Sequence, residues 1–156
     1  MEKVFEFIIT GRKAFIELID GLSIEELNHI PEGFNNNIIW NFGHIVVSTQ
    51  TLAYVRTGTW PDKSVVKYVE AYEKGSKPSY FVNAPEIEQL KALVITSIRK
   101  IEEDYRQGIF KDIQTYSTST YGALLQDIED VLVTSIGHDN LHLGYAQAQR
   151  KAIRKQ

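Results

Sequence analysis

The chain has 156 residues, a net charge of −3, and 43% hydrophobic and 24% charged residues, values typical of one globular domain over residues 1–156. We do not expect nucleic acid as a partner, because a surface that binds the phosphate backbone carries an excess of basic residues, whereas this chain is slightly acidic. The absence of cysteine excludes disulfides, thiolate nucleophiles and cysteine-based metal sites. We expect a cytoplasmic protein, since the amino terminus does not resemble a signal peptide and no stretch approaches the roughly 20 apolar residues that span a membrane.

Apolar residues recur at helical spacing and predict four long helices. The first helix is predicted over residues 2–20, with Gly21 at its end. Ser23 and Glu26 have the spacing of a capping box, which predicts one short helical turn after it. Loop residues rich in asparagine then provide a cap for a second long helix, predicted over residues 37–57.

The second half of the chain contains the other two long helices. Residues 58–83 form a connection too long for a tight turn, which indicates a crossover, and residues 64–74 within it have the pattern of a short amphipathic helix. The third helix is predicted from Pro85, a residue suited to a first helical turn, to residue 107. The fourth is predicted over residues 121–154, and no strong strand signal occurs. The pattern predicts an all-α fold, a four-helix bundle with a long crossover connection.

Histidines occupy the centres of two polar stripes on the predicted helices. His138 and His142 are four residues apart, so they share one helix face and can reach one metal ion. Steps of four and three residues put His44 at the middle of a similar stripe on the second helix. Unsatisfied buried polar groups cost about 1–3 kcal/mol each, so two facing polar stripes predict a functional cavity. The stripes are Asn37, Asn41, His44, Ser48, Thr51 and Val55, and Val131, Ser135, His138, His142, Tyr145 and Gln149.

Two interpretations of the histidines follow from their spacing. In the functional one, His44, His138 and His142 bind a metal ion and leave a coordination position open, as in catalytic sites. Imidazole ligands suit zinc, nickel, copper or iron(II). In the alternative, His44 lies on a half-exposed helix face and the other two form a pH-sensitive surface feature. His29 lies in a loop before Pro31 and is interpreted as a surface residue.

Two motifs resemble the signatures of the DinB-like (YfiT-like) metalloenzyme superfamily. They are Asn36-Asn37-Ile38-Ile39-Trp40-Asn41-Phe42-Gly43-His44-Ile45 and Gly137-His138-Asp139-Asn140-Leu141-His142-Leu143-Gly144. The resemblance implies a four-helix bundle with a long crossover, often a homodimer, and a divalent metal ion, commonly zinc or nickel, on His44, His138 and His142. Characterised relatives include thiol-dependent S-transferases and a thiol-dependent isomerase. Asp139 stands where many relatives have glutamate, and Tyr145 where glutamine is frequent, so the resemblance does not define the substrate.

Three hypotheses for function remain open at this point. The first is a metal-dependent enzyme, a transferase or a hydrolase, that acts on a low-molecular-weight thiol or another small molecule. Asn41, Ser48 and Tyr145 would line its cavity; Tyr145 is the candidate catalytic residue as a hydrogen-bond or proton donor, or else a packed aromatic residue. Asp139 points about 100° away from His138, and this lack of a general base favours thiol transfer over hydrolysis. The others are a non-enzymatic metal-binding or stress-response module and a helical interaction protein without metal.

Overall fold

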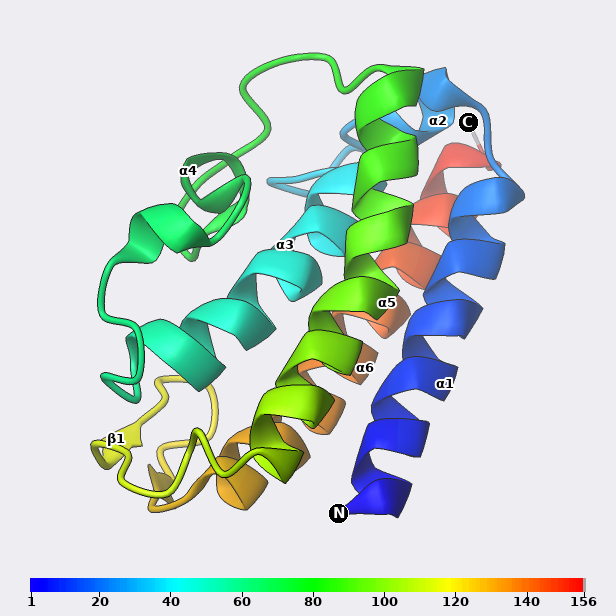
Figure 1. The fold of residues 1–156 in the computed structure, drawn as a ribbon. Helices are drawn as coiled ribbons and strands as arrows, with labels where there is room; N and C mark the ends of the chain where they lie inside the picture. Colours follow the sequence, from blue (N-terminus) through cyan, green and yellow to red (C-terminus); the bar gives the residue numbers. More distant parts are fainter. Residues whose placement is uncertain (156) are drawn as a thin grey trace.

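The computed structural model describes residues 1–155, and four long helices packed together form most of this part of the chain (Figure 1). They are α1 (Glu2–Asp20), α3 (Ile38–Gln50), α5 (Ala84–Arg106) and α6 (Ile128–Ile153). α1 and α3 each pack against both α5 and α6. α1 and α6 run in one direction, and α3 and α5 run in the opposite direction (Figure 1). The predicted all-α four-helix bundle is confirmed, and none of the helices within residues 1–155 is long and apolar enough to cross a membrane.

The amino-terminal elements follow the sequence prediction closely. α1 ends where expected, and the backbone N–H of Gly21 donates to the last turn. The hydroxyl of Ser23 accepts from the backbone N–H of Glu26, and the Glu26 carboxylate accepts from the N–H of Ser23, so the predicted capping box opens α2 (Ile24–Asn28). Asn37 caps α3 by accepting a hydrogen bond of 2.9 Å from the backbone N–H of Trp40. These local interactions fix where α3 begins.

The crossover differs from the prediction in its local structure. α3 continues as one π-helical turn, η1 (Thr51–Val55), and the chain then forms a 3-10 turn, η2 (Lys63–Val65), and the short helix α4 (Val69–Tyr72). The expected single helix over residues 64–74 was wrong, because Tyr68 has a left-handed backbone with φ of 64° that interrupts it. The crossover therefore bends and packs α4 against α3.

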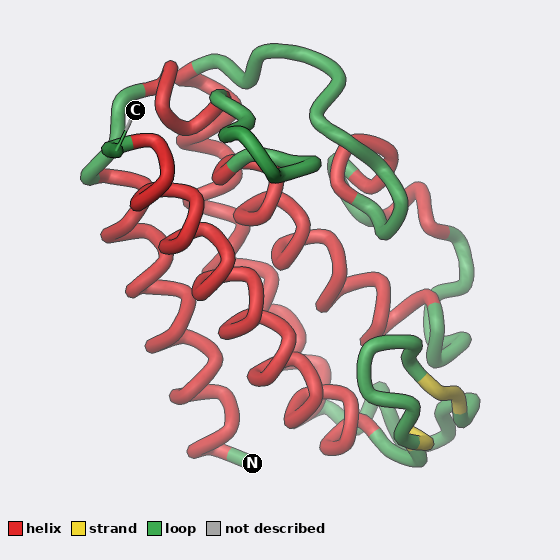
Figure 2. Tube along the Cα trace, turned by 180° about the vertical axis from the view of Figure 1, so that it is seen from behind, coloured by secondary structure: helices red, strands yellow, loops and turns green. Residues whose placement is uncertain are grey.

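A small hairpin replaces the beginning of the predicted fourth helix. β1 (Tyr116–Ser117) pairs antiparallel with β2 (Leu124–Leu125), and Figure 2 shows both in yellow at one end of the bundle. α6 begins at Ile128, not at residue 121, because the Asp127 carboxylate caps it by accepting from the backbone N–H of Asp130 at 2.9 Å. The turn residues before this cap thus belong to the hairpin and lie beside the end of α3.

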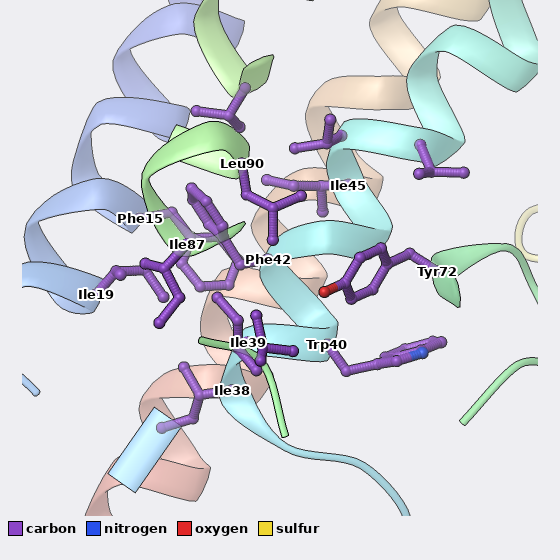
Figure 3. Packing of buried hydrophobic residues seen from close by; sticks show 14 of the residues in the cluster. Phe15, Ile19, Ile38, Ile39, Trp40, Phe42, Ile45, Tyr72, Ile87 and Leu90 are labelled. Atoms are coloured by element: carbon purple, nitrogen blue, oxygen red, sulfur yellow. The ribbon is translucent and has the colours of Figure 1, made fainter. Parts of the chain in front are cut away.

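Apolar side chains from three helices hold α3 in place. Phe15 of α1, Phe42 of α3 and Leu90 of α5 are almost fully buried and lie close together (Figure 3). The rings of Phe15 and Phe42 meet edge to face with centroids 5.1 Å apart. Each such side chain stabilises the fold by about 1.5–3 kcal/mol through burial. This core lies on one side of α3, and the polar stripe with His44 lies on another.

Gly43 allows the crossover to pack directly on α3. A Cβ atom at this position would lie 2.5 Å from the ring of Tyr72, which is buried at the end of α4. Any larger residue would displace that ring, since carbon atoms do not approach so closely without a shift. Gly43 precedes His44, so the same close contact brings the backbone of Tyr72 next to the histidine.

Candidate metal centre

The three predicted histidines lie together between α3 and α6. His44 comes from α3, and His138 and His142 come from successive turns of α6. One ligand nitrogen from each ring can be chosen so that all three lie within 4.8 Å of one another. The ring centroid of His142 lies 4.6 Å from the ring centroid of each of the other two histidines, and the centroids of His44 and His138 are 5.2 Å apart. Imidazoles converging in this way form a candidate site for a metal ion.

Hydrogen bonds fix the ring orientations of His44 and His142. Nδ1 of His44 lies 2.6 Å from the carbonyl oxygen of Tyr72, which can only accept, so this nitrogen carries the proton. Nδ1 of His142 lies 2.8 Å from Oδ1 of Asn41, whose amide nitrogen donates elsewhere. It donates to Oε1 of Gln149 at 3.0 Å, so Oδ1 must be the acceptor for His142. Both histidines therefore present an unprotonated Nε2, as a metal ligand requires.

His138 contains a buried nitrogen that the protein leaves without a hydrogen bond. Within residues 1–155, Nδ1 of His138 and Oδ1 of Asp139 are buried and have no hydrogen-bond partner. The two atoms are 3.7 Å apart, which is too long for a hydrogen bond. An unpaired buried nitrogen beside two oriented imidazoles fits a site that binds a cation.

Burial keeps His44 and His142 in the neutral form that binds metal. The pKa of His44 is lowered to about 4, chiefly by loss of hydration; the hydrogen bond to Tyr72 opposes this lowering, and the neighbouring His138 contributes to it. Loss of hydration and the neighbouring His44 and His138 lower the pKa of His142 to about 3. Both rings are thus uncharged at neutral pH, and no proton has to be displaced before a divalent cation binds.

A cavity of about 280 Å³ adjoins the three histidines. α3 and α6 form two of its walls, the hairpin and the chain after α4 form the others, and Ser48 lines it as predicted. The hydroxyl of Ser48 is 3.0 Å from Nε2 of His44. Tyr121, at the tip of the hairpin, also borders the cavity; it was missed because its segment was predicted to be helical. The size suits a small ligand.

Two other predicted lining residues lie outside this cavity. Asn41 does not border it but holds His142 through the hydrogen bond described above. Tyr145 is 43% exposed as a residue, and its ring packs edge to face on Phe34, with centroids 5.2 Å apart. The ring of Trp40 stacks on the ring of His44, with centroids 4.8 Å apart and an interplanar angle of 12°, so Trp40 is a packing residue of the site.

Arg12 is a buried residue beside the site that the sequence patterns did not reveal. Its side chain has no exposed surface, and its Nε donates to Oδ2 of Asp139 at 2.8 Å. Its remaining N–H groups donate to acceptors on α3 and α5, so one guanidinium from α1 binds α3, α5 and α6. These acceptors are Val94 O at 2.8 Å, Ser97 Oγ at 3.4 Å, Ile45 O at 3.1 Å and Thr49 Oγ1 at 2.7 Å. The position of this charged residue within the apolar stripe of α1 was the one signal in the sequence that could have indicated its burial.

Comparison with known proteins identifies the family of this chain. The model of the DinB superfamily matches residues 8–146, a region that contains His44, His138, His142 and the pair Arg12–Asp139. A search of the curated proteins finds no match. The family match extends over most of the chain and agrees with the helical bundle described above. The chain therefore belongs to the DinB superfamily.

Proposed function

We propose that the chain is a divalent-metal-dependent enzyme with zinc or nickel bound by His44, His138 and His142. The observation that carries this proposal is the convergence of three imidazoles, with ligand atoms within 4.8 Å of one another, beside a cavity of about 280 Å³. Three protein ligands leave a coordination position for a substrate, as catalytic sites do. The remaining ring nitrogens of two ligands are hydrogen-bonded, which is how proteins orient metal-binding histidines.

The protein residues around the site have separable roles in this proposal. A divalent cation would supply Lewis acidity, lowering the pKa of a thiol or a water molecule that it binds. Tyr72 and Asn41 hold His44 and His142 in one orientation and one tautomer. The hydroxyl of Ser48 borders the cavity and donates to Nε2 of His44; a metal ion on that nitrogen would leave the hydroxyl free to donate to a bound substrate.

Thiol transfer is the reaction class that the carboxylates favour. The Asp139 carboxylate is paired with Arg12, and Glu73, which borders the cavity, is paired with Lys63 at 3.2 Å. A hydrolase usually needs a free general base near the attacking water molecule, whereas a metal ion alone can lower the pKa of a bound thiol enough to form the thiolate. We therefore propose S-transfer from a low-molecular-weight thiol to a small electrophile. We further propose that the protein acts as a homodimer in the reducing cytoplasm.

Metal analysis and thiol transfer test the proposal together. Untagged protein should bind about one equivalent of zinc or nickel, while the triple alanine variant of His44, His138 and His142 should bind almost none. Metal-loaded protein should accelerate chloride displacement from chlorodinitrobenzene by a small thiol, and His142→Ala should abolish the acceleration. His29→Ala is the matched control, because His29 is exposed at the end of α2 and does not border the cavity.

Each alternative function has its own outcome in this experiment. Stoichiometric metal without turnover, together with a melting temperature that falls when a chelator is added, would support a non-enzymatic metal-binding module. Protein that takes up no metal after reloading would leave only a helical interaction protein. Equal thiol-transfer rates for wild type and His142→Ala would contradict the proposed reaction.

A further inference from the structure

Two cationic side chains border the cavity beside the histidines. Arg56 follows the π-helical turn η1, and Lys74 follows α4 in the crossover. Arg56 lies over the ring of Tyr116 at 4.7 Å and donates to the carbonyl oxygen of Ser117 at 3.4 Å. Lys74 donates to the hydroxyl of Ser119 on the hairpin. The two cations thus come from separate segments and are both held beside the same cavity.

The π-helical turn is the reason that an arginine borders the cavity. The backbone N–H of Arg56 donates to the carbonyl of Thr51 at 2.9 Å, a bond between residues five apart instead of four. In an uninterrupted α-helix the stripe through His44 and Ser48 would continue to Val55, as the sequence analysis predicted. The wider turn inserts one residue, and Arg56 borders the cavity where Val55 does not. Single π-helical turns occur frequently at functional sites.

The charges at the cavity favour an anionic ligand. Glu73 is the only carboxylate among the described residues that border the cavity, and it is paired with Lys63. Neither Arg56 nor Lys74 forms an ion pair with a carboxylate within residues 1–155. An arginine fork and an ammonium group together match the oxygens of a carboxylate or a phosphate.

Two buried hydroxyls at the cavity also lack partners in the protein. Oγ1 of Thr51 and Oγ1 of Thr118 have no hydrogen-bond partner in the described part of the chain, and both residues border the cavity. Thr51 belongs to η1 and Thr118 follows β1, so they lie close in the sequence to Arg56 and Ser119. Buried hydroxyls without partners are uncommon in proteins, and they are satisfied when a ligand supplies oxygen atoms.

We propose that the cavity recognises a substrate through an anionic group, a carboxylate or a phosphate, bound by Arg56 and Lys74. Arg56 is the principal specificity-determining residue, because its planar fork can bind two oxygens of the anion. The identification of this anion as part of the substrate rests on the proposed function. The placement of an anion site beside the histidines rests on the cavity, the π-helical turn, the two cations without a carboxylate partner and the two unpartnered hydroxyls.

Titration with simple anions tests the site without knowledge of the substrate. Malonate, inorganic phosphate and uncharged malonamide are added separately to zinc-loaded protein, and backbone amide signals of Thr51 and Thr118 are followed by NMR. We expect malonate or phosphate to shift these signals and malonamide not to shift them. Arg56→Gln should weaken anion binding about tenfold, the effect typical of a charge-assisted hydrogen bond near the surface.

Arg154→Gln is the matched control for the loss of one positive charge. Arg154 is also exposed and also donates to a backbone carbonyl, at 3.3 Å, but it does not border the cavity. This variant should bind the anions within about twofold of wild type, because its charge is distant from the site. Equal weakening in both variants, or no anion-dependent shift at all, would overturn the proposal. Tighter binding of malonate would identify a carboxylate substrate, and tighter binding of phosphate a phosphorylated one.

Zinc content separates this proposal from the proposed function. Arg56 is not among the candidate metal ligands, so Arg56→Gln should retain the zinc content of wild type. Protein that binds zinc but no anion would overturn the anion site alone. Protein that takes up no zinc but binds malonate through Arg56 would overturn the metal enzyme alone. The titration is therefore repeated after chelation, so that the anion site is measured in either case.

Discussion

Replacement of Arg12 by methionine should destabilise the protein strongly. The guanidinium is completely buried, and the carboxylate of Asp139 with which it pairs at 2.8 Å is 6% exposed. Methionine fills a similar volume but leaves that carboxylate buried without a partner. Breaking a buried pair from one side costs about 3–5 kcal/mol. That loss is a large fraction of the roughly 5–15 kcal/mol by which domains of this size are stable.

Urea unfolding at neutral pH, followed by far-UV circular dichroism, measures this effect. The double variant Arg12→Met with Asp139→Leu should recover about 1–3 kcal/mol relative to the sum of the single changes, because it removes both charges together. Arg99→Met is the control: its side chain is 60% exposed and pairs with Glu102 at 2.7 Å, so its loss should cost less than about 1 kcal/mol. A free energy of unfolding for Arg12→Met within about 1 kcal/mol of wild type would refute the reasoning.

Two further predictions concern α3 and the histidines. Gly43→Ala should lower the free energy of unfolding by about 1–3 kcal/mol and weaken the proposed zinc binding, since a Cβ there would lie 2.5 Å from a tyrosine ring. The control Gly144→Ala, where a Cβ would meet nothing within 4 Å, should be neutral or stabilising. Similar losses of stability in both variants would contradict this prediction. Metal-free protein should lose about 1–2 kcal/mol per histidine between pH 7 and pH 5. In that window unfolded histidines, with a pKa of 6.5, bind protons that His44 and His142 in the fold do not; unfolding midpoints independent of pH would refute it.

The sequence alone predicted the elements whose signals are local. α1 and the capping box of α2 depend on residues that are neighbours in the chain, so periodicity and cap chemistry were sufficient. The spacing of His138 and His142 also sufficed to put both on one face of α6. The polar stripe on the second predicted helix supplied His44 as the third candidate ligand. The family resemblance, now supported by the match over residues 8–146, favoured the metal site over a surface feature.

The local errors arose where tertiary contacts or special backbone geometry override periodicity. The predicted helix over residues 64–74 is interrupted at Tyr68, whose left-handed conformation no propensity indicates. The predicted start of the fourth helix was seven residues early, because the hairpin pairs Tyr116 with Leu125 and the cap at Asp127 comes after it. The small hairpin has two residues in each strand, too few for an alternating pattern to be visible.

The surroundings of the histidines were decided by the fold. Sequence placed Tyr145 on the same stripe as the histidines, but the bundle turns its ring toward Phe34. Arg56 borders the cavity only because a π-helical turn shifts the helical register by one residue. Sequence determined which helix faces carry the candidate ligands, since that depends on a period of 3.6 residues. Only the packing of four helices could decide that Arg12 neutralises Asp139, because those side chains meet across 127 residues of sequence.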